Sequence, residues 1–400
     1  MNNAFAYVVG ESATRLWGLS SRQRLTRQLR EVGGITVVDD FDQLPPDSNI
    51  LLLRADHLFE TRTLVALSQQ SNTLLVPSGK RQAAAAIVDQ AYLREAMEML
   101  AGADAECSGP LAIADPATLD AFDKKLRRSE PPLLEPVNER RRQWLEDQLY
   151  GNAYKGITDL VTKWVWPRPA RVGVRVCTLL GFSPNAVTLI SLLLMLASCW
   201  LFWTAHYGWG LACGWFMTYL DTVDGKLARV TVMSSRVGHV LDHGMDVIHP
   251  PFWYVFWGLS LSGFMPVLGF DQQALCWIVV VGYALGRAIE GAFEVFLGCE
   301  MFSWRPFDAW SRLVTARRNP CLILLTAGVA LGQPDGGFLA VVIWTVFSTA
   351  MLALRLVQAI VVRTRAGRLQ SWLSDPDTAR RDHPMSYRTF SATRAAYGDA

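Results

Sequence analysis

The chain has 400 residues, of which 51% are hydrophobic and 18% are charged, and its formal net charge is +2. Such a small net charge gives no indication of nucleic-acid binding. The seven cysteines are scattered and form no CxxC pair, which argues against a zinc site and against a disulfide framework. The length suggests two or three domains.

Residues 1–134 are predicted to form a small cytoplasmic α/β domain. Apolar runs typical of buried strands, AFAYVVG and NILLLRAD, alternate with the amphipathic segment SSRQRLTRQLREVG. Such alternation is typical of an α/β sandwich.

This first segment resembles a shortened nucleotidyltransferase domain. Gly10 and Thr14-Arg15-Leu16 stand where that family has a glycine-rich loop containing TRL, and Asp56 stands on its metal-aspartate strand. The loop GESATRLWG lacks the run of glycines that a triphosphate would need against the backbone. We therefore expect a degenerate, non-catalytic relative. An unrelated α/β regulatory domain is the alternative.

Residues 135–181 are predicted to be a linker followed by a juxtamembrane amphipathic helix. Tryptophans and basic residues are interleaved in the stretch KGITDLVTKWVWPRPARVGVRV. This pattern suits a helix that lies on the anionic inner leaflet of a membrane.

Residues 182–365 are mostly apolar and divide into about six segments of the ~20 residues that cross a bilayer as a helix. The predicted spans lie near 186–205, near 208–229, from 237 onward, near 274–297, near 319–334 and near 338–362. The chain is thus predicted to be a mainly α-helical integral membrane protein. Its six transmembrane helices follow the small α/β cytoplasmic domain.

Basic residues orient these spans. Arginines cluster before the first span, between the second and third, between the fourth and fifth, and after the sixth, whereas the opposite loops contain no lysine or arginine. The positive-inside rule then places both termini on the cytoplasmic side of a multi-pass protein of the inner membrane.

Four aspartates form the most informative pattern. Asp221 and Asp224 fall on one helix face, and Asp242 and Asp246 form a stripe on the next helix. Carboxylates at membrane depth are costly and usually mark function. Four of them repel one another unless cations neutralise them, and hard oxygen ligands select Mg²⁺, Mn²⁺ or Ca²⁺. Two such ions would suit a diphosphate. The alternative, a buried polar cluster satisfied by ion pairs, would need more arginines nearby.

The pattern resembles the signature of the CDP-alcohol phosphotransferase (CDP-alcohol phosphatidyltransferase) family, DxxDGxxAR, eight residues, then GxxxDxxxD. Every fixed position is matched. The resemblance implies a six-helix membrane fold with a metal site open to the cytoplasm. It also implies an enzyme of phospholipid or related polar-lipid synthesis. In that family a CDP-linked donor such as CDP-diacylglycerol binds over the metals, the hydroxyl of an acceptor alcohol attacks its β-phosphorus, and CMP leaves.

The resemblance also implies residue roles. Asp221, Asp224, Asp242 and Asp246 would hold two Mg²⁺ or Mn²⁺ ions, and Asp246 would also take the acceptor's proton. The remaining matched positions would bind the CDP-linked donor: Gly225, Ala228 and Gly238 by shaping the cytidine pocket, and Arg229 by supporting the diphosphate or the aspartates.

The stretch SPNAVTLIS resembles the family's sequence just before its first span. Asn185 or Thr188 could therefore reach the donor diphosphate. Helix capping by Ser183, with Pro184 at the first helical position, explains the same residues equally well.

The run ARRNP contains Arg317 and Arg318, close to the fifth span. It resembles the stretch that holds the acceptor's phosphate in the inositol-phosphate-using branch of the family, and arginine fits phosphate with two parallel hydrogen bonds. The alternative is ordinary positive-inside charge. Within the fourth span, Arg287 and Glu290 are expected to form a buried pair.

Residues 366–400 are polar and irregular and are predicted to be a disordered cytoplasmic tail. The favoured function is a CDP-alcohol phosphotransferase, which could be a homodimer and whose acceptor alcohol could carry a phosphate. The alternatives are an inositol phosphodiester synthase that uses CDP-inositol and, from another class, a non-catalytic membrane scaffold.

Overall fold

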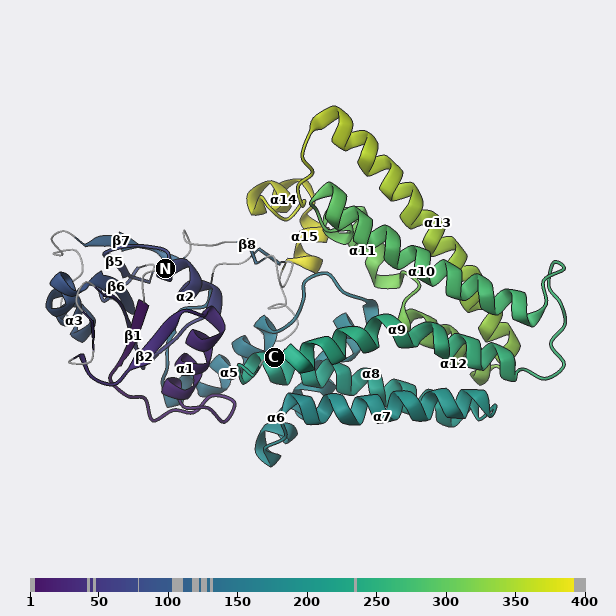
Figure 1. Cartoon of the computed structure of the whole chain (residues 1–400), viewed down its shortest axis with the longest axis horizontal. Helices are drawn as coiled ribbons and strands as arrows, with labels where there is room; N and C mark the ends of the chain where they lie inside the picture. The colour runs from purple at the N-terminus through teal and green to yellow at the C-terminus, as the bar shows by residue number, and fades with distance from the viewer. Residues whose placement is uncertain are drawn as a thin grey trace. The chain divides into compact units, whose positions relative to one another are not determined.

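A computed structural model describes residues 4–41, 44–45, 48–77, 79–102, 111–116, 122–123, 128–129, 132–233 and 236–391. The side chains of residues 122–123, 128–129, 236–237, 239–243 and 366 lie outside this description. The chain forms two compact units (Figure 1). One holds residues up to 154 with 229–233, and the other holds 155–228 with the residues from 234 to 391.

The first unit is built on a six-stranded sheet with the strand order β2-β1-β3-β6-β5-β7. Strand β6 runs antiparallel to its neighbours β3 and β5, while β1 is parallel to β2 and β3, and β5 is parallel to β7. The strands are β1 (Ala4–Val9), β2 (Ile35–Val38), β3 (Asn49–Arg54), β5 (Thr73–Leu75), β6 (Ala85–Asp89) and β7 (Ala112–Ala114).

Helices cover both faces of this sheet. Leu51 and Leu53 of β3 pack with α1 (Ser21–Val32) and α2 (Thr61–Ser68). The alternate residues of the same strand pack on the other face with α3 (Leu93–Ala101). This in-and-out alternation follows from the period of a strand. The predicted α/β organisation of the N-terminal segment is confirmed.

The remaining elements of this unit are short. They are β4 (His57–Leu58), which pairs with β10 (Glu135–Pro136), the hairpin of β8 (Phe122–Asp123) and β9 (Arg128–Ser129), the 3₁₀ turns η2 (Gln90–Tyr92) and η4 (Glu139–Arg141), and α5 (Arg142–Asn152).

The second unit is helical. A π-helical turn, η5 (Val161–Val165), leads into α6 (Pro167–Leu180). Six helices then lie at the positions of the predicted spans: α7 (Pro184–Trp203), α8 (Tyr207–Val230), α9 (Arg236–Ser260), α10 (Gln272–Leu297), α12 (Arg318–Ala330) and α13 (Pro334–Ala366). Between α10 and α12 stand η6 (Met301–Ser303) and α11 (Pro306–Val314).

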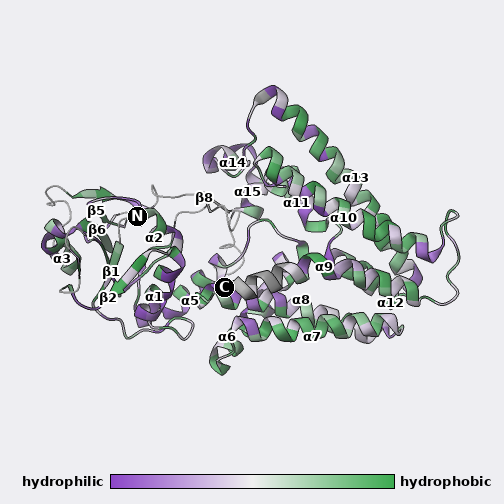
Figure 2. Ribbon diagram, in the orientation of Figure 1, coloured by the Kyte–Doolittle hydropathy of each residue, from purple (hydrophilic) through white to green (hydrophobic). Residues whose placement is uncertain are grey.

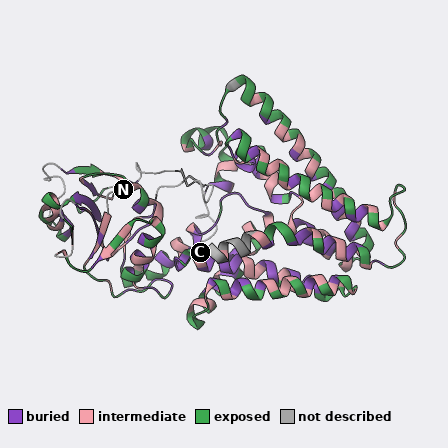
Figure 3. Ribbon diagram, viewed as in Figure 1, coloured by how far each residue is buried: buried purple, intermediate pink, exposed green. Residues whose placement is uncertain are grey.

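Three helices within the described residues are long and apolar enough to cross a membrane, by length and composition: Pro184–Trp203, Gln272–Leu297 and Pro334–Arg365. Figure 2 shows hydrophobic stretches along these helices. On α7, Leu189, Leu193, Leu196 and Trp200 recur at helical spacing and are all more than half exposed. Figure 3 shows exposed stretches along this helix. Such an outward apolar stripe suits contact with lipid. Six membrane-spanning helices remain a prediction.

Aromatic residues fill the core of this unit. Phe202 of α7 contacts Trp253 and Trp257 of α9, and these residues pack with Leu275 of α10 and Phe338 of α13. Small residues allow close approach elsewhere: a Cβ built on Gly328 of α12 would lie 2.6 Å from the Cα of Gly337 on α13. The helix ends that carry the polar residues are held in fixed relation by this packing.

The C-terminal segment differs from the prediction of a disordered tail. Residues up to 391 form α14 (Pro376–Asp382) and α15 (Pro384–Phe390). The Trp310 indole of α11 donates to Ser386 Oγ at 3.0 Å, and Phe390 is fully buried against Trp310. The tail is polar on average, but this hydrogen bond and this aromatic contact anchor it. Residues 392–400 lie outside the described part of the chain.

Candidate active site

Polar contacts join helices α7 and α8 and hold Asp224 of α8 in place. Ser191 Oγ donates to the carbonyl oxygen of Met217 at 3.2 Å, and Thr188 Oγ1 donates to Asp224 Oδ2 at 2.6 Å. Asp224 is only 3% exposed. One oxygen of the Asp224 carboxylate is therefore oriented by α7 before any ligand arrives.

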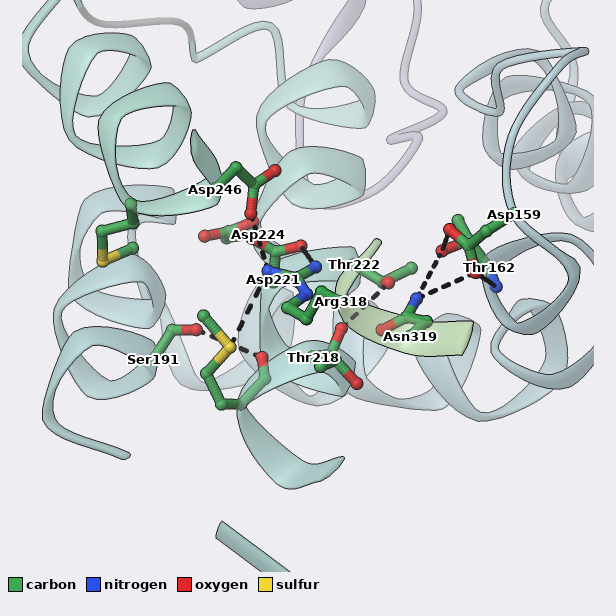
Figure 4. A network of polar contacts seen from close by, with 12 residues as sticks. Asp159, Thr162, Ser191, Thr218, Asp221, Thr222, Asp224, Asp246, Arg318 and Asn319 are labelled. Carbon is green, nitrogen blue, oxygen red and sulfur yellow. Dashed lines mark hydrogen bonds and ion pairs between the residues drawn. The ribbon is translucent and has the colours of Figure 1, made fainter. Parts of the chain in front are cut away.

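Arg318 links two further aspartates from different helices. Its Nη2 donates to Asp221 Oδ2 of α8 and its Nη1 donates to Asp246 Oδ1 of α9, each at 2.6 Å (Figure 4). Asp221 is mostly buried, whereas the Asp246 side chain is 45% exposed. The arginine at the start of α12 thus occupies the place of a shared counter-ion between two carboxylates that would otherwise repel each other.

The other oxygen of Asp221 is left over. Asp221 Oδ1 is buried and has no hydrogen-bond partner among the described residues. An ionised oxygen in this state is costly unless a cation or a donor reaches it. The described residues contain no group of three or more His, Cys, Asp or Glu side chains gathered closely enough to hold a metal ion. The side chain of Asp242, the remaining aspartate of the motif, lies outside the described part of the chain.

The predicted donor-binding residues lie in different surroundings. Gly225 and Ala228 are half-buried on α8, and Gly238 is half-buried on α9. Arg229 is exposed, and its guanidinium donates to the carbonyl oxygen of Ala153 at 2.9 Å.

At the start of α7 the structure tests the capping explanation, while a contact of Asn185 or Thr188 with a donor diphosphate stays a prediction. Ser183 Oγ accepts from the backbone N–H of Ala186 at 3.2 Å with Pro184 at the first helical position, so the capping prediction is confirmed. Asn185 is exposed. Thr188, one turn further on, lies against Asp224 and thereby joins the aspartate site.

The two arginines of ARRNP have different partners. Arg318 lies on the aspartates, whereas Arg317 pairs with Glu290 of α10, which also pairs with Arg287. The predicted Arg287–Glu290 pair is confirmed. Arg317 and Arg312 both lie 5.5 Å from the ring of Phe302. Two guanidinium groups sharing one carboxylate leave a surplus of positive charge in a partly buried place.

Tyr283 connects these arginines to the aspartates. The Tyr283 hydroxyl donates to the backbone carbonyl of Asp246 at 3.3 Å, and the Arg287 guanidinium lies 5.6 Å from the Tyr283 ring. Tyr283, Arg287 and Glu290 stand at i, i+4 and i+7 on α10, which is one helix face. We define the cationic cluster as Arg287, Arg312 and Arg317 with Glu290.

Sequence reasoning missed one buried network beside the aspartates. Asp159 Oδ1 accepts from the backbone N–H groups of Val161 and Thr162, each at 3.0 Å, and from Asn319 Nδ2 at 2.9 Å. Burial alone would raise the pKa of the Asp159 carboxyl, but the charge of Arg312 and the hydrogen bonds outweigh it, so this pKa lies below its usual value. The signal available was an aspartate three residues before a threonine, a common start of a helical turn.

The first unit shows a different kind of carboxylate at the predicted metal position. Asp56 accepts two hydrogen bonds from Arg54, at 2.9 and 2.7 Å, and lies 2.8 Å from His57 Nδ1. The contact with His57 is the main cause that holds the pKa of this carboxyl well below its usual range. Both oxygens of Asp56 are therefore used by its own neighbours in the chain.

The TRL sequence is followed by Trp17, whose two nitrogens both donate to Glu146 of α5.

Comparison with known proteins agrees with the motif. The sequence profile of the CDP-alcohol phosphatidyltransferase family matches residues 182–298. Over 132 residues the chain is 33% identical to proteins named cardiolipin synthase from Mycobacterium bovis and Mycobacterium tuberculosis, which covers 28% of this chain and 63% of theirs. Choline/ethanolaminephosphotransferase 1 of Arabidopsis thaliana is 26% identical over 172 residues, 32% of this chain and 43% of that protein.

The chain spans less than two thirds of the length of these relatives. The matched region runs from the start of α7 to the end of α10 and contains all four aspartates of the motif. Residues 182–298 therefore resemble a CDP-alcohol phosphatidyltransferase domain.

Proposed function

We propose that the protein transfers a substituted phosphate, such as a phosphatidyl group, from a CDP-linked donor to an acceptor alcohol in phospholipid synthesis. The acceptor oxygen forms a bond to the β-phosphorus of the donor, the bond from that phosphorus to CMP breaks, and CMP leaves. The observation that carries this proposal is the meeting of Asp221 and Asp246, from two helices of the family domain, at the single guanidinium of Arg318. A non-catalytic scaffold has no need for carboxylates placed together in this way.

Asp246 suits the role of general base. It is the more exposed of the two aspartates that Arg318 links, so an acceptor hydroxyl can reach it from the solvent side. In the proposed reaction it takes the proton of that hydroxyl as the new bond to phosphorus forms. Arg318 would orient the carboxylate for this transfer.

The aspartates fit hard divalent cations. All candidate ligands are carboxylates, which Mg²⁺ and Mn²⁺ prefer, and the buried Asp221 Oδ1 lacks a partner among the described residues. We propose that Asp221, Asp224, Asp242 and Asp246 hold two such ions. When bound, the ions would neutralise the donor's diphosphate and stabilise the charge on the leaving CMP.

The nucleotide part of the donor would lie against α8 and α9. Gly225, Ala228 and Gly238 present little side-chain volume, so a flat base can approach the helix backbone there. Arg229, Asn185 and Thr188 complete the proposed donor site. Thr188 would act through Asp224, whose carboxylate it orients.

The acceptor is proposed to carry negative charge. The cationic cluster continues from Asp246 through Tyr283 to Arg287 and Arg317, and guanidinium groups bind phosphate through charge-assisted hydrogen bonds. The same cluster would repel a cationic amino alcohol. Of the two kinds of relatives, this favours the cardiolipin synthases over the choline/ethanolaminephosphotransferase as guides to the acceptor.

The membrane arrangement follows the same reasoning. We propose six membrane-spanning helices, α7 to α10 with α12 and α13, in a multi-pass protein of the inner membrane. Because arginines cluster at the ends that carry the aspartates, the active site and both termini are proposed to face the cytoplasm, where nucleotide donors are found.

The test is an assay of CMP release by the purified full-length protein with CDP-diacylglycerol, Mg²⁺ and a panel of acceptors. The expected result is activity with an anionic acceptor, such as phosphatidylglycerol, glycerol phosphate or inositol phosphate, and none with choline or ethanolamine. CDP-inositol is included as an alternative donor. The absence of CMP release with every donor and acceptor would overturn the proposal.

A further inference from the structure

A buried hydrogen-bond network ties the segment before α6 to the start of α12 (Figure 4). Asp159, 7% exposed, accepts at Oδ1 from Asn319 Nδ2 at 2.9 Å, and Thr162 Oγ1 donates to Asp159 Oδ2 at 2.8 Å. Asn319 is 4% exposed. A hydrogen bond between a buried carboxylate and a buried amide is worth more than one at the surface, because water does not compete for either group.

Asn319 directly follows Arg318 in the first turn of α12. The preceding residue, Arg317, stands at the N-cap position and makes no side-chain capping hydrogen bond. The first turn of this helix is therefore held from outside, through the Asn319 side chain. The orientation of that amide is determined, since turning it over would place its oxygen against the Asp159 carboxylate.

Arg318 depends on this turn for its own position. Its guanidinium must reach Asp221 and Asp246 at once, with 2.6 Å to each. A shift of the first turn of α12 by an ångström would break at least one of these bonds.

We propose that Asp159 is a positioning residue of the active site, which holds Arg318 against Asp221 and Asp246 by fixing Asn319. The proposal rests on the proposed function only for its effect on activity, because the contacts themselves do not depend on it. It gives the predicted juxtamembrane segment a structural role in the second unit. The first two N–H groups of the π-helical turn η5 donate to Asp159, so this turn becomes part of the support of α12.

Two variants with opposite design test the contact. Asp159→Ala removes the charged acceptor of Asn319 and leaves only the longer bond to Thr162 Oγ1 at 3.3 Å. Losing a hydrogen bond to a charged group is expected to lower kcat by about ten- to a hundred-fold. The KM for the CDP-linked donor should change little. Combining Asp159→Asn with Asn319→Asp exchanges donor and acceptor, so the pair can form again and much of kcat should return. A residue that only stabilises the fold would not show this rescue.

A double-mutant cycle shows whether Asp159 acts through Arg318. If it does, Asp159→Ala should reduce kcat much less in an Arg318→Ala background than in the native background. Asp308→Asn is the matched control. Asp308 is also a buried aspartate of the second unit, but its two oxygens accept from Arg355, at 2.6 and 2.8 Å. The fold-losses in kcat of Asp308→Asn and Arg318→Ala should therefore multiply in the double variant, as expected for independent residues. If the fold-losses of Asp159→Ala and Arg318→Ala also multiply, the proposal is overturned.

Amide hydrogen exchange gives a readout that needs no activity. Asp159→Ala should speed exchange in the first turns of α12, near residues 318–324, and Asp308→Asn should not. If the native protein releases no CMP with any substrate, the proposed function fails, and this measurement alone decides the positioning proposal. Unchanged exchange in this peptide would refute the positioning role whatever the activity.

Discussion

Asp56 in the first unit and Asp246 in the second both bind an arginine, yet their partners come from different distances along the chain. Asp56 takes its partners from Arg54 and His57, two residues and one residue away. Asp246 meets Arg318, which is 72 residues away and also binds Asp221 from a third helix. A carboxylate satisfied by its neighbours needs only local structure. One that depends on three helices meeting is held in place by the whole fold, as expected for a catalytic site.

The hydrogen-bond partners of the carboxylate oxygens differ between the two units in the same way. Asp56 has contacts for both oxygens, so a metal ion would have to displace Arg54 or His57. Asp221 keeps one buried oxygen without a partner among the described residues. Because an unsatisfied buried oxygen destabilises the protein by about 1–3 kcal/mol or more when charged, its presence points to a ligand. We therefore predict that divalent cations bind at the aspartates of the second unit and not at Asp56.

Removing metal is the largest expected effect. Chelation with EDTA should abolish CMP release, because the proposed carboxylate site and the diphosphate cannot approach each other without cations. Adding Mg²⁺ or Mn²⁺ back should restore it, which separates metal loss from denaturation. Full activity of carefully demetallated protein would contradict the assignment of the aspartates as metal ligands.

Exchange of a single carboxylate should separate the two regions. Asp246→Asn is expected to lower kcat by about 10²- to 10⁴-fold, the usual contribution of a general base. Asp56→Asn, of equal size, should leave CMP release from a ready-made CDP-linked donor unchanged. Equal losses in both variants would mean that the first unit takes part in the transfer. As the control, thermal unfolding in detergent measures how much of each variant is folded.

The sequence predicted much of this distinction, but unevenly. The spacing of Asp221, Asp224 and Asp246 sets them on helix faces, and a helix face is a local property that can be derived from the 3.6-residue period. The six helices follow from apolar runs in the same way. The family signature then assigned chemistry to these positions.

The contacts of Arg318 and Asp159 could not be derived in this manner. Arg318 was predicted at an acceptor phosphate, and the structure places it on the aspartates, because which helix meets α8 and α9 is decided by tertiary packing. Asp159 lies 160 residues from Asn319, and no periodicity relates the two. The tail was judged by its polar composition, which conceals the contact of Phe390 with Trp310.

Arg317 should affect the acceptor more than the chemistry. Arg317→Ala removes one guanidinium of the cationic cluster without touching the Asp221–Arg318–Asp246 contacts. The acceptor KM is expected to rise by about ten-fold for an anionic acceptor, as for the loss of one charge-assisted hydrogen bond, with kcat and the donor KM little changed. Arg317→Lys should recover part of the affinity, since a point charge lacks the planar fork. Kinetics unchanged for every acceptor would leave the cluster as a topology signal.

The smallest expected effect concerns acid stability of the first unit. The pKa of Asp56 is lowered in the folded protein, chiefly by His57 and also by Arg54, relative to about 3.9 in an unfolded chain. Its contribution to stability is therefore fully present above about pH 4 and is lost as the pH falls below that value. The contribution is small, because the side chain is 43% exposed and water screens the charges.

Pepsin cleavage of the full-length protein between pH 4.5 and 2 measures this contribution, since cleavage follows the population of the opened form. Asp56→Asn should be cut slightly faster than the native protein within residues 49–60 at pH 4.5. The difference between the two rates should shrink as the pH falls from 4 towards 2, because the unfolded chain binds the proton that the folded carboxyl resists. Asp39→Asn is the control: its carboxylate pairs with Arg22 but is 80% exposed, so its rate should match the native one throughout. A rate difference for Asp56→Asn that stays constant between pH 4.5 and 2 would mean that the shape of the side chain, and not its charge, stabilises the end of β3.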